Sequence, residues 1–414
     1  MGTNKNVAKP TSGLPIEANH VRSWASGLDD KTIEQAERTA ALDIVQKPLA
    51  LMPDAHLGIG ATVGSVIATK DAIIPAAVGV DIGCGMVAQK TSYTHDQIAS
   101  SLRKIHAGIA KSVPSGQPKR GNRSAGSHRA ASRSKTLDRL VREAPPVKSE
   151  KFNARKIAAQ FGTLGGGNHF VELATDENSD VWIVLHSGSR GPGNLFAQEH
   201  IGRARNLMRR VLEAPLDDPD LASFVQGTPE FEAYIYGMLW AQEYAYANRE
   251  QMMEAVVGVV ATQMKAAGFT ATKNPIVGKR IQCHHNYACR ERHNGEDLWI
   301  TRKGAIDASA HNLGIIPGSM ATGSFIVSGL GNEQSYRSAS HGAGRRLSRR
   351  AARRQLSAAS LSRRMSDIAW NDEADALVDE HPDAYKDITQ VMANQRDLVR
   401  VERRLQTILN YKGT

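Results

Sequence analysis

The sequence predicts a mixed α/β (α+β) protein whose functional groups lie at the ends of strands. Two observations lead to this fold class: β-rich apolar runs occur between segments of helical periodicity, and several of these runs end in glycine-rich loops. The same loops carry aspartate, cysteine and histidine side chains. With 414 residues, of which 41% are hydrophobic and 23% charged, the chain can bury a large core in one domain or in two fused domains.

Composition also narrows the class of protein. No apolar run approaches the roughly 20 residues that cross a bilayer, and the N-terminal stretch lacks the apolar segment of a signal peptide. The three cysteines, Cys84, Cys283 and Cys289, argue against a disulfide framework and favour a reducing compartment. We therefore expect a cytoplasmic protein without a membrane partner. The net charge of +10 favours an anionic partner such as nucleic acid.

The first elements along the chain are a helix and a strand. Residues 29–46 have the start signal and the periodicity of an amphipathic helix. Residues 49–52 are typical of a short buried strand, which we expect to end in a loop over 53–60. Within this loop, Asp54 and His56 either support a functional site or are ordinary turn residues.

The next β-rich runs, 63–69 and 73–80, lead into the sequence GVDIGCGM at 79–86. Here Asp81 and Cys84 stand three residues apart among glycines, which let the backbone turn sharply. The turn can bring a carboxylate and a thiolate to one point, which is half of a metal site. The alternative is a tight turn with an inert buried thiol.

A change of composition follows the helix predicted over 94–113. Residues 114–135 are polar and strongly basic, with scarcely any apolar side chain, and we expect a mobile excursion from the core. Its basic side chains either follow a phosphate backbone or only keep the loop solvated. A second helix, at 150–161, leads to the glycines at 165–167, where a ligand can approach the backbone closely.

Further strands and helices complete the pattern. Residues 181–186 form a buried strand pattern that ends in His186, and Arg190 in the following turn is either an anion clamp or part of a surface ion pair. A long helix or helical pair is predicted from 228 to 264. The C-terminal third is expected to contain strands at 298–302 and 324–327, a turn-rich loop at 314–320, a basic helix at 345–356 and further helices to the end of the chain.

Histidines, a cysteine and an aspartate from separate segments suggest one metal centre. On an extended segment adjacent side chains point to opposite faces, so only one histidine of the pair at 284–285 should reach it. The expected donors suit one or two divalent ions and are Asp81, Cys84, His169, His186 and either His284 or His285. His341 lies outside this set, among small residues that suit a nucleotide.

Many separate motifs, taken in order, resemble those of the RtcB family of GTP-dependent RNA-splicing ligases. The resemblance runs from about Leu49 to Lys412. It implies a single catalytic domain over residues 1–414, with mixed sheets, surrounding helices and a fold of the family's own type. The loop at 57–60 reads LGIG where the family often has LGKG, so Ile59 replaces a positive charge. The motifs are MPDAHLGIGATVGSVIATK, AIIPAAVGVDIGCGM, LGGGNHFVEL, LHSGSRG, CHHNY, HNLGIIPGSM, SFIVSGLGNE, SHGAGR and a C-terminal lysine–glycine pair.

The resemblance also implies roles for individual residues. Two manganese ions would be held by Asp81 with His169 and by His186 with His285, and the Cys84 thiolate would bridge them. His341 would be the nucleophile that takes GMP from GTP. The implied nucleotide-binding residues are Asn168, His169, Phe170, Val171, Glu172, His285, Asn286, Pro317, Gly318, Ser319, Met320, Ser324, His341, Gly342, Ala343, Gly344 and Lys412.

The family joins an RNA 2′,3′-cyclic phosphate or 3′-phosphate end to a 5′-hydroxyl end, through a guanylylated RNA 3′ end, in RNA repair or tRNA splicing. One alternative is an enzyme that caps RNA 3′-phosphates with GMP, or a metal-dependent RNA phosphodiesterase, without sealing. Another is a basic RNA-binding protein with a structural metal. The sequence does not specify the physiological RNA, the need for an activator protein or the oligomeric state.

Overall fold

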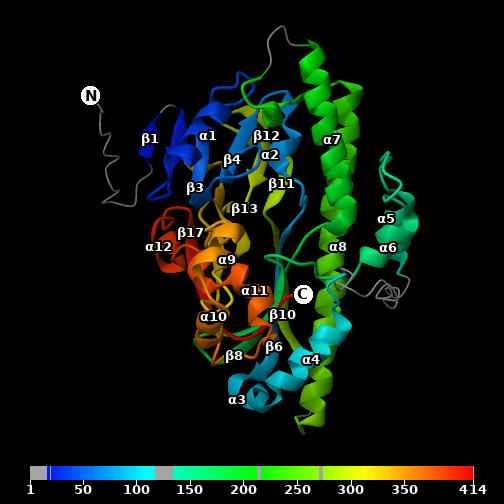
Figure 1. Ribbon diagram of the computed structural model, residues 1–414, viewed down its shortest axis with the longest axis vertical. Helices are drawn as coiled ribbons and strands as arrows, with labels where there is room; N and C mark the ends of the chain where they lie inside the picture. Colours follow the sequence, from blue (N-terminus) through cyan, green and yellow to red (C-terminus); the bar gives the residue numbers. More distant parts are fainter. Residues whose placement is uncertain (1–15, 19, 117–133, 212–215, 270–273, 414) are drawn as a thin grey trace.

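The computed structural model describes residues 16–18, 20–116, 134–211, 216–269 and 274–413. Two large sheets lie one above the other in the view of Figure 1, with two long helices along one side and a group of short helices on the other. This arrangement confirms the predicted mixed α/β class.

The upper sheet in Figure 1 has six strands. Only β2 and β3 pair in parallel, and the other neighbours are antiparallel. In order across the sheet, the strands are β1 (Ile16–Ala18), β2 (Val21–Ser23), β3 (Leu49–His56), β4 (Val63–Thr69), β12 (Glu296–Lys303) and β11 (Asn286–His293).

Strand β3 corrects the prediction of a loop from residue 53 onward. It continues to His56, and Asp54 is fully buried. Proline normally breaks the ladder of hydrogen bonds between strands, but the β3–β4 register is irregular between Leu51 and His56, and Pro53 falls within that irregularity. Asp54 is therefore a strand residue whose side chain points into the protein.

The lower sheet has seven strands, and all neighbours are antiparallel. Across the sheet they are β10 (Ile276–His284), β6 (Gly85–Thr94), β8 (Asp180–Ser187), β7 (Phe170–Thr175), β17 (Val399–Tyr411), β15 (Ser324–Gly329) and β14 (Leu313–Pro317). The helical C-terminus that we predicted is wrong for its last segment, because β17 is a 13-residue strand between β7 and β15. Its Val, Ile and Thr residues favour a strand, although several charges interrupt the pattern.

Two long helices run side by side along the sheets, α7 (Arg190–Val211) and α8 (Pro229–Ala266) (Figure 1). The single helix α8 confirms the prediction for 228–264, and the side chain of Thr228 caps it by accepting a hydrogen bond from the Phe231 backbone N–H. Helix α8 packs against β6, β8 and α4 (Leu102–Ser112). Because α8 lies beneath the ends of β6 and β8, it can support side chains placed there.

Four other predicted elements need correction. The run 73–80 is not a strand: after the two-residue β5 (Ala72–Ile73), Pro75 occupies the first position of a short helix, α2 (Pro75–Val78). The loop predicted over 314–320 is a strand up to Pro317. The first helix, α1 (Asp30–Ala40), and the basic helix, α9 (Arg349–Gln355), are shorter than predicted.

The remaining elements are short. They are α3 (His95–Ile98), η1 (Ala99–Ser101), α5 (Lys135–Arg142), α6 (Ala154–Gln160), η2 (Pro219–Leu221), β9 (Phe224–Val225), β13 (Ala305–Asp307), η3 (Glu333–Ser335), β16 (Ser338–Ser340), α10 (Ala358–Arg364), α11 (Ala374–Leu377), η4 (Val378–Glu380), η5 (Pro382–Ala384) and α12 (Ile388–Ala393).

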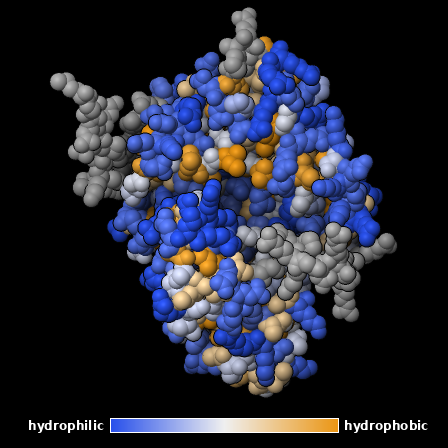
Figure 2. Space-filling view, viewed as in Figure 1, coloured by the Kyte–Doolittle hydropathy of each residue, from blue (hydrophilic) through white to orange (hydrophobic). Residues whose placement is uncertain are grey.

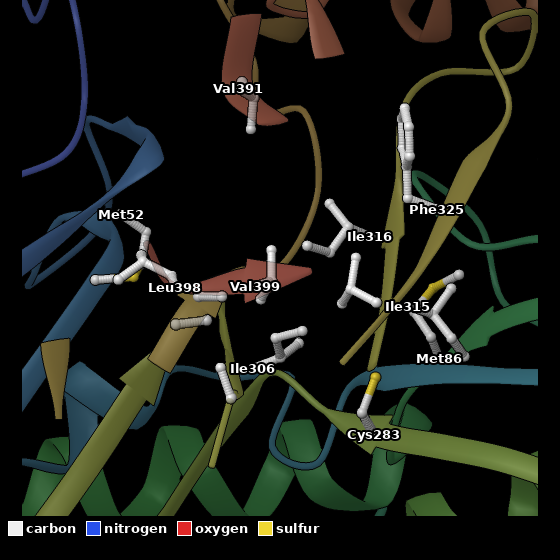
Figure 3. Packing of buried hydrophobic residues seen from close by; sticks show 14 of the residues in the cluster. Met52, Met86, Cys283, Ile306, Ile315, Ile316, Phe325, Val391, Leu398 and Val399 are labelled. Atoms are coloured by element: carbon white, nitrogen blue, oxygen red, sulfur yellow. The ribbon is translucent and has the colours of Figure 1, made fainter. Parts of the chain in front are cut away.

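One hydrophobic cluster contains residues of both sheets. Figure 3 shows Met52 of β3 in the same cluster as Met86 of β6, Phe325 of β15 and Val399 of β17. Burial of these apolar side chains stabilises the contact between the sheets. The two sheets therefore share a core, and the strand ends at its edge have a rigid base.

The basic segment predicted as an excursion lies mostly outside the described residues, since 117–133 are not described. Its first residues are packed: the carbonyls of Pro114 and Ser115 accept hydrogen bonds from the N–H groups of Leu164 and Gly165. No helix in the described part of the chain is both long and apolar enough to cross a membrane.

Candidate metal and nucleotide site

The ends of four strands of the lower sheet bring the predicted metal ligands together. In the β6 register, Gly85 lies opposite His284 of β10 and opposite Ser187 of β8. The His285 N–H also donates a hydrogen bond to the Cys84 carbonyl over 2.8 Å. As a result, side chains from four places meet at one point. Asp81 and Cys84 come from the loop before β6, His169 from the residue before β7, His186 from β8, and His285 from the junction of β10 and β11.

The Cys84 sulfur lies in the middle of this cluster. It is 3.2 Å from Nε2 of His186 and 3.4 Å from Nε2 of His169. His169 Nε2 is 3.1 Å from Asp81 Oδ2, and His186 Nε2 is 3.1 Å from His285 Nε2. The donors form two groups that share Cys84, and within each group the ligand atoms lie within 4.8 Å of one another.

The protonation of these groups suits a divalent cation. Burial lowers the pKa values of His186 and His285 well below the ordinary value, so both rings are neutral and have a lone pair to donate. Burial and the Asp81 carboxylate raise the pKa of the Cys84 thiol, and a bound cation would reverse this effect. For Asp81, burial raises the carboxyl pKa, but the hydrogen bond and charge of His169 outweigh it and lower the pKa.

Hydrogen bonds on the far side of the rings set their orientation. His186 Nδ1 lies 3.1 Å from the Asn168 carbonyl and donates to it, which leaves Nε2 free to bind a cation. His285 Nδ1 is buried without a hydrogen-bond partner among the described residues. Arg190, which begins α7, lies 3.0 Å from His169 Nδ1 and packs over Gly165. The predicted anion clamp is therefore next to the cluster.

A buried arginine that we did not predict joins two of the ligand segments. Arg249 of α8 is fully buried, and its Nη1 donates to the carbonyls of Gly83 and Ser187 over 2.7 and 3.0 Å. These residues directly precede Cys84 and directly follow His186. Gly83 has a φ of 72° and would place a Cβ 2.8 Å from the Cα of Gln242 on α8, so a glycine is required at this contact.

The two histidines at 284–285 point to opposite sides, as the alternation of side chains predicts. His285 joins the cluster, whereas His284 Nδ1 lies 2.9 Å from the Gly83 carbonyl and 3.2 Å from Arg249 Nη2. His284 therefore helps to hold the loop that carries Cys84 and does not reach the other ligands.

His341 faces the cluster from the turn after β16. Its ring centroid is 4.9 Å from that of His285, and its Nδ1 is 2.6 Å from Oδ2 of Asp54 on β3. Burial lowers the pKa of His341, but the negative charge of the adjacent Asp54 carboxylate outweighs it and raises the pKa. Because a carboxylate only accepts, the proton of the neutral ring belongs on Nδ1, and Nε2 is the nitrogen with a free lone pair.

A pocket of about 680 Å³ connects His341 with the cluster, within the size range of small-ligand sites. Of the predicted nucleotide-binding residues, Val171 lies on the opposite face of β7 in a separate core cluster, and Ser324 is buried behind the lining. His169 also does not line the pocket. The predicted residues that do line it are Asp81, Cys84, Asn168, Phe170, Glu172, His186, His285, Asn286, Pro317, Gly318, Ser319, Met320, His341, Gly342, Ala343, Gly344 and Lys412.

Two buried ionisable side chains form part of the pocket wall away from the metal ligands. Burial raises the pKa of Glu172 to about 8, and one of its oxygens, Oε1, has no partner among the described residues. Lys412 Nζ donates to Glu380 Oε2 over 2.7 Å and to the Gly167 carbonyl over 3.3 Å. The carboxylic group of Glu172 is thus available for a ligand with N–H donors.

These observations define an α/β protein with an oxygen, nitrogen and sulfur donor cluster that opens onto a nucleotide-sized pocket. The family model described as "tRNA-splicing ligase RtcB" matches residues 35–413, and the chain therefore belongs to the RtcB family.

Several individual proteins are similar over most of their length. The chain is 41% identical to the RNA-splicing ligase RtcB of Escherichia coli K12, with 97% of this chain and 99% of that protein covered. It is 29% identical to the tRNA-splicing ligase RtcB of Aeropyrum pernix, with 93% and 92% covered. It is 28% identical to the RNA-splicing ligase RtcB of Mycobacterium bovis, with 92% and 100% covered.

Proposed function

We propose that this protein is an RNA ligase that joins an RNA 2′,3′-cyclic phosphate or 3′-phosphate end to a 5′-hydroxyl end, with GTP and two manganese ions as cofactors. The observation that carries the proposal is the position of His341, which is bound to Asp54 on one side and faces the donor cluster in the same pocket on the other. Membership of the RtcB family supports the RNA substrate. We propose one catalytic domain and, from the cysteine content, a cytoplasmic location.

The donor cluster would hold two divalent ions. Asp81 with His169 and His186 with His285 form two groups, and Cys84 belongs to both. Bound there, manganese would supply positive charge that stabilises the negative charge developing on a transferred phosphate.

The pocket wall would bind the guanine nucleotide. Oε1 of Glu172, which has no partner among the described residues, would accept one hydrogen bond from guanine, whose N1–H and exocyclic amine are both donors. Lys412 lies 5.8 Å above the Phe170 ring and adds positive charge on the same wall. Gly318 and Gly342 line the same pocket, and a Cβ on either would crowd the protein's own chain, at Thr322 and Pro317 respectively.

The reaction would proceed in three transfers. Nε2 of His341 attacks the α-phosphorus of GTP, a P–N bond forms and pyrophosphate leaves, while Asp54 keeps the remaining ring proton on Nδ1. An oxygen of the RNA 3′-phosphate then displaces His341 and takes GMP. The 5′-hydroxyl finally attacks the RNA phosphate, loses its proton and expels GMP as the diester forms. A 2′,3′-cyclic phosphate would first be opened by water.

Product analysis tests this proposal. The purified protein is given GTP, manganese and two RNAs with a 3′-phosphate and a 5′-hydroxyl end. The proposal predicts a joined RNA whose formation requires GTP. RNA that accumulates with a 3′-terminal GMP would indicate capping without sealing, cleavage without GTP would indicate a phosphodiesterase, and no turnover would favour a binding protein. Repeating the reaction with and without cell extract tests whether an activator protein is needed.

A further inference from the structure

Helix α9 presents two different rows of arginines. Arg349 and Arg353, one turn apart, bind acidic residues of the neighbouring segment η4: both contact Asp379, and Arg349 also contacts Glu380. Arg350 and Arg354, also one turn apart, are exposed, and neither has an ion-pair or hydrogen-bond partner among the described residues. The charge of the inner row is thus compensated, and that of the outer row is not.

Two of the nearby carboxylates already have arginine partners. Asp379 accepts from both arginines of the inner row, and Asp383 pairs with Arg364. Within the part of the chain that the structure describes, the guanidinium groups of Arg350 and Arg354 form no ion pair with an acidic side chain. Figure 2 shows a strongly hydrophilic surface in the region of α9, beside the hollow near the middle of this face.

The outer row stands on the same helix as a residue that lines the pocket. Arg345 and Arg349 line the pocket, and Arg350 follows Arg349 directly in the helix. Arg349 also approaches Gly167, next to Asn168, since a Cβ on Gly167 would lie 3.2 Å from its Nη2. Arginines thus stand at the pocket, where acidic side chains pair with them, and on the exposed side of α9, where Arg350 and Arg354 have no such partner among the described residues.

A polynucleotide cannot be contained in a pocket of about 680 Å³, so an RNA bound there must cross the rim. Side chains four residues apart on a helix stand about 5–6 Å apart, which is close to the separation of neighbouring phosphates on one strand. Guanidinium groups with free donors are well suited to phosphate. Resting on the proposed function, we infer that Arg350 and Arg354 bind the backbone of the RNA end that carries the 3′-phosphate, as it leaves the pocket over α9.

The test compares two double variants with equal loss of charge. Arg350→Gln with Arg354→Gln removes the outer row. The control, Arg292→Gln with Arg396→Gln, removes two exposed arginines whose side chains also lack ion-pair and hydrogen-bond partners among the described residues and that do not line the pocket. Binding of a fluorescent single-stranded RNA with a 3′-phosphate is measured by anisotropy as a function of salt concentration.

Loss of two phosphate contacts should reduce the slope of log K against log salt by about 1.4, because each contact on a single strand contributes about 0.7. If counterion release is the whole effect, affinity at about 0.1 M salt falls about 25-fold. The control should bind like the wild type, and a dinucleotide, which the pocket itself can hold, should show no difference between wild type and the outer-row variant.

An unchanged slope and affinity in the outer-row variant would overturn the inference, as would an equal loss in the control, which would indicate a general effect of net charge. Transfer of GMP from GTP to the wild-type protein, measured without RNA, tests the proposed function separately. A failure there would refute the ligase proposal, whereas the binding comparison would still decide whether α9 contacts RNA.

Discussion

Asp54→Asn should slow the transfer of GMP from GTP to the protein by about 10- to 10⁴-fold. The Asp54 carboxylate is fully buried, 2.6 Å from Nδ1 of His341, and also accepts a hydrogen bond from the Gly342 N–H over 3.3 Å. Loss of a hydrogen bond to a charged group costs about 1.5–3 kcal/mol, which gives the lower limit. An amide can also donate to Nδ1 and move the ring proton to Nε2, and the corresponding change in a Ser-His-Asp triad costs about 10⁴ in rate.

The pH dependence separates this positioning role from a simple charge effect. Asp54 raises the pKa of His341, so its removal should lower that pKa. The neutral, nucleophilic ring would then be more abundant in the variant near the wild-type pKa, and a pure charge effect would leave the rate unchanged or higher at neutral pH. We expect the acidic limb of the rate profile to move to lower pH, while the plateau falls.

The assay is single-turnover formation of the GMP adduct over a range of pH. Asp176→Asn is a matched control, because Asp176 is also buried and accepts from the Trp182 indole N–H over 3.0 Å, but it lies at the far end of β7 and β8. This control should keep the wild-type rate. A wild-type plateau in Asp54→Asn would refute the positioning of His341 by Asp54.

Three further changes test other parts of the site. Cys84→Ala should abolish divalent-metal binding by both ligand groups in a calorimetric titration. The control Cys283→Ala, in the hydrophobic core, should retain metal binding. Full manganese occupancy in Cys84→Ala would rule out a bridging sulfur. Arg249→Met should give a circular dichroism spectrum of a folded protein but bind manganese about 10–100-fold more weakly, and Arg249→Lys should recover part of this affinity. Wild-type affinity in Arg249→Met would show that the hydrogen bonds of Arg249 to Gly83 and Ser187 do not affect metal binding. Burial raises the pKa of Glu172 from 4.5 to about 8, so the contribution of this group to folding stability is complete below pH 4.5 and is lost as the pH rises to about 8. The midpoint of thermal unfolding should therefore fall less over this pH range in Glu172→Gln than in the wild type. Parallel curves would contradict the raised pKa.

Sequence patterns predicted the side chains of the site correctly where their placement depends on a short segment of the chain. Glycines beside Cys84, and the alternation that separates His284 from His285, predicted which side chains could meet, and the structure brings those side chains together. The strand ending at His186 and the long helix after Thr228 were also predictable from apolar periodicity. At these positions the residues close in sequence are enough to determine the local backbone structure and the direction of the side chains.

Contacts between distant segments were not predictable. Nothing local indicates that Asp54 meets a histidine nearly three hundred residues later, and Pro53 made its strand look like a loop. Arg249 lies in the middle of a helix, without a motif, and its role depends on how α8 packs beneath two strand ends. The arginines of β17 concealed a strand that tertiary pairing on both sides stabilises.

The most direct test of the central claim is the chemical nature of the GMP adduct. The protein is incubated with radiolabelled GTP and manganese, and the adduct is tested for stability in acid and alkali and located by peptide mass spectrometry. We predict an acid-labile, alkali-stable phosphoramidate on the peptide with His341, no adduct in His341→Ala, and sealing by that variant of RNA that already carries a 3′-terminal GMP. An alkali-labile ester on Ser338 or Ser340, or an adduct that persists in His341→Ala, would contradict the proposed mechanism.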